Sequence, residues 1–237
     1  MNVIDLRPDL RMVLDSGPGQ AYLLRRGRQV VLVDTGIAGQ GDAIAAALLD
    51  WGLDRGALTH VLLTHWHPDH VGSAAELASW PAVQVWAHHA DAPIIRGDKD
   101  GSLPALTHSE EGFYAKIAGS IPAAPTCRVD RELGDDEDLP ALHARVLSTP
   151  GHTDGSIALL FTEAGVLFTG DVATEHEGQV ILGPFNNDRP EARESFRRFA
   201  TIDVDTVCFG HGRALRGPDT AKLHAAATAV IVPDPLG

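Results

Sequence analysis

The sequence concentrates metal-binding residue types at positions 65–70, where His65, His67, Asp69 and His70 stand together. Neutral imidazole nitrogens and carboxylate oxygens are common ligands of zinc and iron. His65 and His67 are two residues apart, so in an extended segment their side chains leave on the same side. Asp69 and His70 follow where a turn is expected to enter a helix, so they can point toward a second position. The spacing therefore favours two neighbouring metal ions over one.

Three further metal-capable side chains stand downstream of this motif. Each follows the end of a predicted strand and lies beside a glycine, which allows the backbone to turn tightly. They are His152 after the strand 142–148, Asp171 after the strand 166–169 and His211 after the strand 206–209. Ligands gathered from strand ends at one edge of a sheet are a common way to build a site on a rigid scaffold.

The elements that must position these residues are short apolar runs that alternate with helix-like segments. Strands are predicted at 20–24, 29–33, 57–63, 83–87, 129–133, 142–148, 156–161, 166–169 and 206–209. Helices are predicted at 41–51, 71–80, 190–200 and 220–230. Polar turns at 25–28 and 163–165 indicate two hairpins. Residues 91–126 carry four prolines and no clear period, so this segment is predicted to be an insertion with short helices. Hairpins mixed with covering helices indicate α/β layers with mixed sheets.

Composition narrows the class of protein. The chain of 237 residues is 44% hydrophobic, which is enough for one sizeable core. With 19 basic and 32 acidic residues its formal net charge is −13, which argues against binding to nucleic acid or to an anionic membrane surface. No apolar run is long enough for a spanning helix, and charges interrupt the region where a signal peptide would be apolar. We therefore expect a cytoplasmic protein; its oligomeric state is not indicated. Cys127 and Cys208 are expected to be reduced and buried.

With these residues in place, the chain resembles the metallo-β-lactamase superfamily, in its glyoxalase II-like and lactonase-like branch. The resemblance covers residues 20–212 and rests, in the family's order, on Asp34 after a strand, the 65–70 motif, Gly151-His152, Gly170-Asp171 and Gly210-His211. It implies one α/β domain over residues 1–237, folded as a four-layer αβ/βα sandwich of two mixed β-sheets flanked by helices. It places the metals in a cleft at one edge of the sheets and makes 91–126 a substrate-pocket insertion.

The resemblance also implies a ligand set. One ion would be held by His65, His67 and His152, the other by Asp69, His70 and His211, and Asp171 would bridge the two. Asp34 would orient a ligand rather than bind metal; the alternative interpretation is a turn carboxylate at a strand end. Two zinc ions are the first expectation, with iron or manganese as alternatives.

Such a centre predicts hydrolysis. Two cations roughly 3.5–4 Å apart lower the pKa of a shared water toward about 7, so a bridging hydroxide can attack a small ester, thioester or lactone. Asp69 is a candidate proton acceptor, although a metal-bound carboxylate is a weak base. The short segment after His211 does not favour a glutathione thioester. The alternatives are a persulfide dioxygenase with one iron and a non-enzymatic metal-binding relic of the fold.

Other polar residues carry weaker signals. The pair Asn186-Asn187 is a candidate for hydrogen bonds to substrate, although a plain turn is favoured. One of His88 and His89 could reach the cleft, with surface or packing roles favoured. The remaining histidines are expected to be half-buried (His60) or on the surface (His108, His143, His176 and His224), and Trp66 is expected to support packing.

Overall fold

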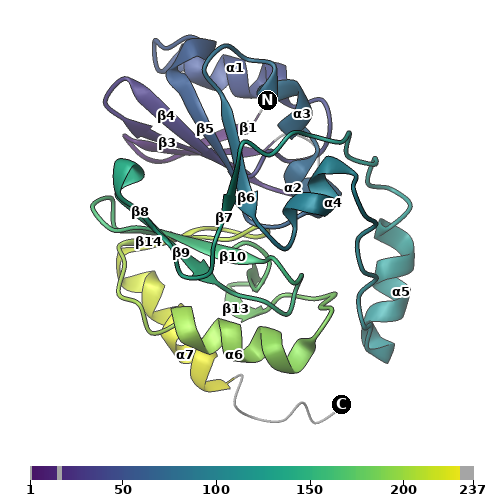
Figure 1. Ribbon diagram of the computed structural model, residues 1–237. Helices are drawn as coiled ribbons and strands as arrows, with labels where there is room; N and C mark the ends of the chain where they lie inside the picture. Colours follow the sequence, from purple (N-terminus) through teal and green to yellow (C-terminus); the bar gives the residue numbers. More distant parts are fainter. Residues whose placement is uncertain (1, 15–17, 230–237) are drawn as a thin grey trace. The chain divides into compact units, whose positions relative to one another are not determined.

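The computed structural model describes residues 2–14 and 18–229, which form two compact units (Figure 1). The described residues within 1–101 and 119–133 belong to unit 1, and those within 102–118 and 134–237 belong to unit 2. Each unit has its own sheet, helices and core. The expectation of one domain over residues 1–237 stays a prediction.

Unit 1 is built on a seven-stranded mixed sheet with the strands in chain order. The strands are β1 (Asn2–Arg7), β2 (Leu10–Leu14), β3 (Ala21–Arg26), β4 (Gln29–Val33), β5 (Leu58–Leu63), β6 (Gln84–His88) and β7 (Arg131–Leu133). Neighbours from β1 to β4 pair antiparallel, and neighbours from β4 to β7 pair parallel. Parallel strands are usually buried on both faces, and β5 and β6 accordingly bury most of their apolar side chains.

Four α-helices and one 3-10 turn complete the part of unit 1 that the structure describes. They are α1 (Gly41–Asp50), η1 (Arg55–Ala57), α2 (Pro68–Val71), α3 (Ala74–Ala78) and α4 (Ala92–Arg96). The α-helices bury Ile44, Leu48, Leu77 and Ile95 in one core cluster with apolar residues of the sheet. This packing fixes the ends of β4 and β5, where Asp34 and His65 are located.

Unit 2 contains a six-stranded mixed sheet in the order β15-β14-β11-β10-β9-β8 and a separate hairpin of β12 and β13. Its strands are β8 (Asp138–Leu139), β9 (Ala144–Ser148), β10 (Ile157–Phe161), β11 (Val166–Phe168), β12 (Ala173–His176), β13 (Gln179–Leu182), β14 (Thr206–Cys208) and β15 (Leu215–Arg216). Strands β11 and β14 pair parallel, and the other pairs are antiparallel.

The helices of unit 2 are α5 (His108–Ile117), α6 (Arg189–Phe199) and α7 (Ala221–Ala229), with 3-10 turns η2 (Pro140–Leu142) and η3 (Gly217–Thr220). Phe196 and Phe199 of α6 and Leu223 of α7 pack into the core with residues of the sheet and of the β12–β13 hairpin. Helix α5 differs from them, because none of its residues is buried.

Most of the predicted elements are confirmed, including the hairpins β3–β4 and β10–β11 and the short helices of the 91–126 segment. The single helix predicted at 71–80 is wrong, because α2 and α3 are separated at Gly72-Ser73. The Gly72 N–H donates to the Gly36 carbonyl oxygen and the Ser73 N–H donates to the Thr35 hydroxyl, so neither N–H group continues the hydrogen-bond pattern of a helix. Residue 230 of the last predicted helix lies outside the described residues.

Strands β1, β2, β8, β12, β13 and β15 were not predicted. Strands β1 and β2 contain charged residues, which interrupt the apolar runs by which strands were predicted. Arg11 is nevertheless buried in β2, where it donates to Asp5 and to the Ala47 carbonyl oxygen. Both cysteines are free and buried, as predicted. Within the described residues no helix has the length and apolar character needed to cross a membrane.

Candidate metal centre

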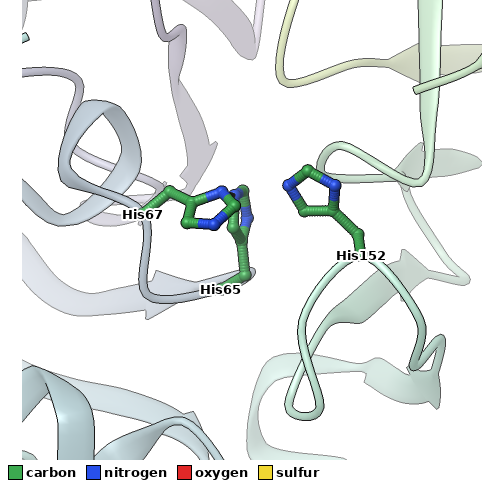
Figure 2. A group of neighbouring side chains, drawn as sticks. All are labelled: His65, His67 and His152. Carbon is green, nitrogen blue, oxygen red and sulfur yellow. Dashed lines mark hydrogen bonds between the residues drawn. The ribbon is translucent and has the colours of Figure 1, made fainter. Parts of the chain in front are cut away.

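The motif at 65–70 occupies the junction between β5 and α2 of unit 1. Pro68 opens α2, where its missing N–H costs no hydrogen bond. His65 and His67 therefore precede the helix, while Asp69 and His70 lie on its first turn. Figure 2 shows the rings of His65 and His67 side by side, with His65 Nε2 3.0 Å from His67 Nδ1 and the ring planes at 83°. We call His65, His67, Asp69 and His70 the first cluster.

Asp34 lies behind the first cluster at the end of β4. It is buried and has a φ of 56°, the left-handed conformation that Asp adopts more readily than most residues. Its Oδ1 accepts the Thr64 N–H at 2.8 Å, and its Oδ2 accepts the Thr64 hydroxyl at 2.7 Å. Oδ2 also lies 2.9 Å from Nδ1 of His70. Asp34 thus contacts one predicted ligand directly, and its effect on metal binding stays a prediction.

This network sets the tautomers of two histidines. The Thr64 hydroxyl has one proton and gives it to Asp34, so at 3.0 Å it must accept from Nδ1 of His65. Nδ1 of His70 likewise donates to the Asp34 carboxylate. When neutral, both rings then carry their lone pair on Nε2, which is the form that can bind a metal ion.

Hydrogen bonds to the backbone of the 65–70 motif also hold the first cluster in place. The Thr35 N–H and hydroxyl both donate to the His70 carbonyl oxygen, at 2.7 and 2.8 Å. The buried Asp91 accepts the Trp66 N–H at 3.0 Å, between the two histidines of the extended segment. Asp69 Oδ2 lies 3.8 Å from Nε2 of His70. Sequence reasoning missed Thr35, Thr64 and Asp91, although Asp91 follows a strand end as Asp34 does.

His152 of unit 2 lies in the loop after β9 (Figure 2). Gly151 precedes it with a φ of 116°, and a Cβ there would lie 2.2 Å from the Ala192 nitrogen of α6. The Asn187 N–H donates to the His152 carbonyl oxygen, and the Asp188 N–H to that of Gly151. The loop is therefore fixed by the start of α6, and His152 is buried.

Asp171 and His211 follow β11 and β14, which are parallel neighbours, so both side chains lie at the same end of the sheet. Asp171 Oδ2 is 3.0 Å from Nε2 of His211 and 3.8 Å from Nε2 of His152. We call His152, Asp171 and His211 the second cluster. Its carboxylate lies between two histidines that the resemblance assigns to different ions, and its bridging role stays a prediction.

Strand β12 supplies two residues that the sequence did not indicate, Thr174 and Glu175. The Thr174 hydroxyl donates to the His211 carbonyl oxygen at 2.9 Å. Burial alone would raise the pKa of the Glu175 carboxyl group, but hydrogen bonds from the backbone N–H groups of Arg213 and Gly178 outweigh burial and lower this pKa. The only signal in the sequence is proximity to Asp171.

The residues with weaker signals in the sequence differ in their environment. Asn186 is buried and its Nδ2 donates to the Gly183 carbonyl oxygen, which is the turn role that was favoured. His88 is buried at the end of β6, and His89 is exposed. His60 is half-buried against Trp86 as expected, and burial together with Arg131 lowers its pKa. Trp66 packs against the unit 1 core.

The donor atoms of both clusters fit a divalent metal. Two donors about 2.0–2.1 Å from a tetrahedral ion lie roughly 3.3 Å from one another. The pair His65 Nε2 and His67 Nδ1 and the pair His211 Nε2 and Asp171 Oδ2 are each separated by 3.0 Å. Imidazole nitrogens with a few carboxylates suit zinc, iron and manganese better than magnesium or calcium, which prefer oxygen ligands.

Comparisons with known proteins identify the family of this chain. Residues 14–211 match the family model of the metallo-β-lactamase superfamily. The protein named "Probable metallo-hydrolase YflN" from Bacillus subtilis is 29% identical over 79% of this chain and 76% of its own length. An atrochrysone carboxyl ACP thioesterase from Aspergillus terreus is 24% identical over 74% of this chain and 47% of its own length.

Among solved structures, TTHA1623 in a di-iron-bound form is 25% identical with a TM-score of 0.66, over 90% of this chain and 96% of that chain. The predicted fold class, with two large mixed sheets and helices, is confirmed. The chain belongs to the metallo-β-lactamase superfamily, a superfamily of metallo-hydrolases.

Proposed function

We propose that this protein is a metal-dependent hydrolase of a small ester, thioester or lactone, and that the first and second clusters together bind two divalent cations. The observation that carries the proposal is the pairing of donor atoms at 3.0 Å in each cluster, within a chain of this superfamily. Zinc is the first candidate metal, with iron and manganese as alternatives.

The proposed ligand set follows the family pattern. His65, His67 and His152 would hold one ion, Asp69, His70 and His211 would hold the other, and Asp171 would be shared between them. Cations bound there would polarise the substrate carbonyl group and lower the pKa of a water molecule. The chain prepares the ligands through Asp34, because the network of Asp34 and Thr64 keeps the Nε2 lone pairs of His65 and His70 available.

Asp69 has a second proposed role as a proton acceptor during turnover. Its side chain is 10% exposed and lies on the first turn of α2, beside His70. An Asp69→Asn variant that binds both metals but turns over slowly would support this role, whereas loss of one metal would assign Asp69 to the ligand set alone.

The segment 91–126 is proposed to select the substrate. Its helix α5 places Phe113 and Tyr114 against Phe185, with ring centroids 5.5 and 5.2 Å apart, and Phe113 is 55% exposed. Phe185 is two residues from Asn187, which hydrogen-bonds the His152 backbone. An aromatic face next to a candidate ligand loop suits an apolar acyl group, and one relative is named as an acyl carrier protein thioesterase.

The experiment that tests the proposal is elemental analysis of protein purified without added metal, followed by assays against p-nitrophenyl esters, acyl thioesters and lactones. We expect about two zinc ions per chain and hydrolysis in at least one class. One iron per chain with oxygen consumption on a persulfide would instead favour the dioxygenase. Two metals with no turnover on any class would favour the relic, and no metal after reconstitution would contradict the proposal.

A further inference from the structure

Strand β12 and the His211 loop of unit 2 are joined by a set of hydrogen bonds that involve the backbone of the candidate ligand. The Thr174 hydroxyl donates to the His211 carbonyl oxygen at 2.9 Å, and the Glu175 N–H donates to the same oxygen at 3.3 Å. The Glu175 carboxylate accepts the Arg213 N–H at 2.7 Å. Both backbone neighbours of Gly212 are therefore fixed by two consecutive residues of β12.

Strand β12 and the His211 loop pack so closely that no side chain fits between them at Gly212. Gly212 has a φ of 94°, and a Cβ there would lie 2.1 Å from the Glu175 carbonyl oxygen. The second carboxylate oxygen of Glu175 accepts the Gly178 N–H at 2.6 Å, in the turn between β12 and β13. Glu175 is 9% exposed, so these bonds are largely shielded from water. The turn and the ligand loop are thus connected through one buried carboxylate.

Unit 1 contains a counterpart of this arrangement. There, the Thr35 hydroxyl and N–H both donate to the carbonyl oxygen of His70. In both units a threonine hydroxyl and a backbone N–H hold a candidate ligand by its carbonyl oxygen, which leaves the imidazole ring for another partner. His211 needs this support more, because its side chain is 30% exposed whereas that of His70 is fully buried.

We propose that Thr174 and Glu175 are positioning residues for His211, which fix its loop so that the imidazole is presented next to Asp171. The inference rests on the proposed function, since His211 must bind metal for its position to matter. Outer partners of metal ligands typically change metal affinity by 10–100-fold when they are removed. The loss of one hydrogen bond to a backbone carbonyl lies at the lower end of that range, at about tenfold.

The test compares Thr174→Val, which keeps the shape but removes the hydroxyl, with Thr174→Ser, which keeps the hydroxyl. Zinc affinity is measured by competition with a chromophoric chelator, and cobalt absorption spectra report the coordination geometry without any turnover. We expect Thr174→Val to weaken the binding of one of the two ions about tenfold and to alter the cobalt spectrum. Thr174→Ser should stay within about twofold of the wild type.

Thr162→Val is the matched control, because the Thr162 hydroxyl also donates to a histidine carbonyl oxygen, that of His143, which is not a candidate ligand. Wild-type affinity in Thr174→Val, or an equal loss in Thr162→Val, would overturn the inference. If Thr174→Val fails to fold without metal, Glu175→Gln decides, since it removes one acceptor oxygen and should also weaken binding. A wild-type protein that binds no metal would contradict the proposed function itself.

Discussion

Unit 1 presents its four candidate ligands on one strand–helix junction, whereas unit 2 collects three from separate loops that follow β9, β11 and β14. In the first cluster the local chain geometry determines the spacing, because an extended segment leads directly into a helix that starts at Pro68. In the second cluster the sheet determines the spacing, because the parallel pair β11–β14 brings Asp171 and His211 to one end. The first cluster is therefore encoded locally, and the second depends on tertiary structure.

The two clusters also differ in how their histidines are held. The His70 ring is fixed through Nδ1 by Asp34, and its carbonyl oxygen by Thr35. The more exposed His211 lies against Asp171, with its carbonyl oxygen held from β12. Mutations of the residues that hold His70 should therefore weaken metal binding by changing the orientation of its ring. Mutations of the residues that hold His211 should weaken metal binding by moving its loop.

Removal of one ligand from each cluster should give the largest effects. We expect His67→Ala and Asp171→Ala both to reduce hydrolysis by more than about a hundredfold, since even outer partners of a ligand are worth 10–100-fold. Asp171→Ala should lose more metal, because its carboxylate is proposed to be shared between the ions. Elemental analysis and turnover on the best substrate check this prediction. His108→Ala is the control, because that side chain is fully exposed, and full activity in His67→Ala would contradict the ligand assignment.

Gly151→Ala tests how far the second cluster depends on tertiary contacts. The φ of 116° and the 2.2 Å approach to Ala192 both oppose a side chain, so we expect a loss of more than about 3 kcal/mol in the free energy of unfolding. Gly217→Ala is the control, because its φ is also positive but its Cβ would meet open space, and its cost should be about 1–2 kcal/mol. Urea unfolding of the metal-free proteins measures both, and equal losses would show that α6 does not constrain the loop.

Asp34→Asn should separate ring orientation from folding in unit 1. Asn accepts the left-handed conformation but has only one acceptor oxygen, so it cannot satisfy both Thr64 donors and His70. We expect zinc affinity to fall 10–100-fold while the circular dichroism spectrum is unchanged. Asp136→Asn is matched to it, with a φ of 49° and no candidate ligand in contact. Unchanged affinity in Asp34→Asn would leave Asp34 as a turn residue.

The sequence was sufficient to predict the elements that consist of apolar runs. It was insufficient to predict strands that contain charged residues. Strands β4, β5 and β6 follow directly from their composition, while β2 contains an arginine that is buried only because β1 and α1 supply its partners. The β12–β13 hairpin was missed, because Glu175 and His176 interrupt its apolar pattern.

The same limit applies to the candidate site. Histidine and aspartate are common metal ligands, and here they follow predicted strands, so all seven candidate ligands could be proposed from the sequence. Thr35, Thr174 and Glu175 act through hydrogen bonds to segments distant in the chain. Their proximity to Asp34 or Asp171 in the sequence does not indicate these bonds. Prediction from residue type therefore reaches the ligands but not the bonds that hold them.

The two helices of the 91–126 segment are attached to their units in different ways. Helix α4 of unit 1 is held by burial of Ala92 and Ile95, whereas α5 of unit 2 has no buried residue and is held by Glu110. The Glu110 carboxylate accepts the N–H groups of Thr107 and Phe185 and pairs with Arg189. Burial alone would raise the pKa of Glu110, but these bonds outweigh it and lower the pKa below its ordinary value of 4.5.

A lowered pKa in the folded state means that Glu110 stabilises the protein above about pH 4.5, and that this contribution is lost as the pH falls through the folded-state pKa. We expect Glu110→Gln to lower the Tm by about 2–4 °C at pH 7, from a loss of about 1 kcal/mol. The difference from the wild type should shrink below pH 4.5. Glu111→Gln is the control, since this neighbour is 62% exposed and should change the Tm little. A gap that stays constant between pH 7 and pH 3.5 would show that α5 is attached by its aromatic contacts with Phe185 rather than by the charge of Glu110.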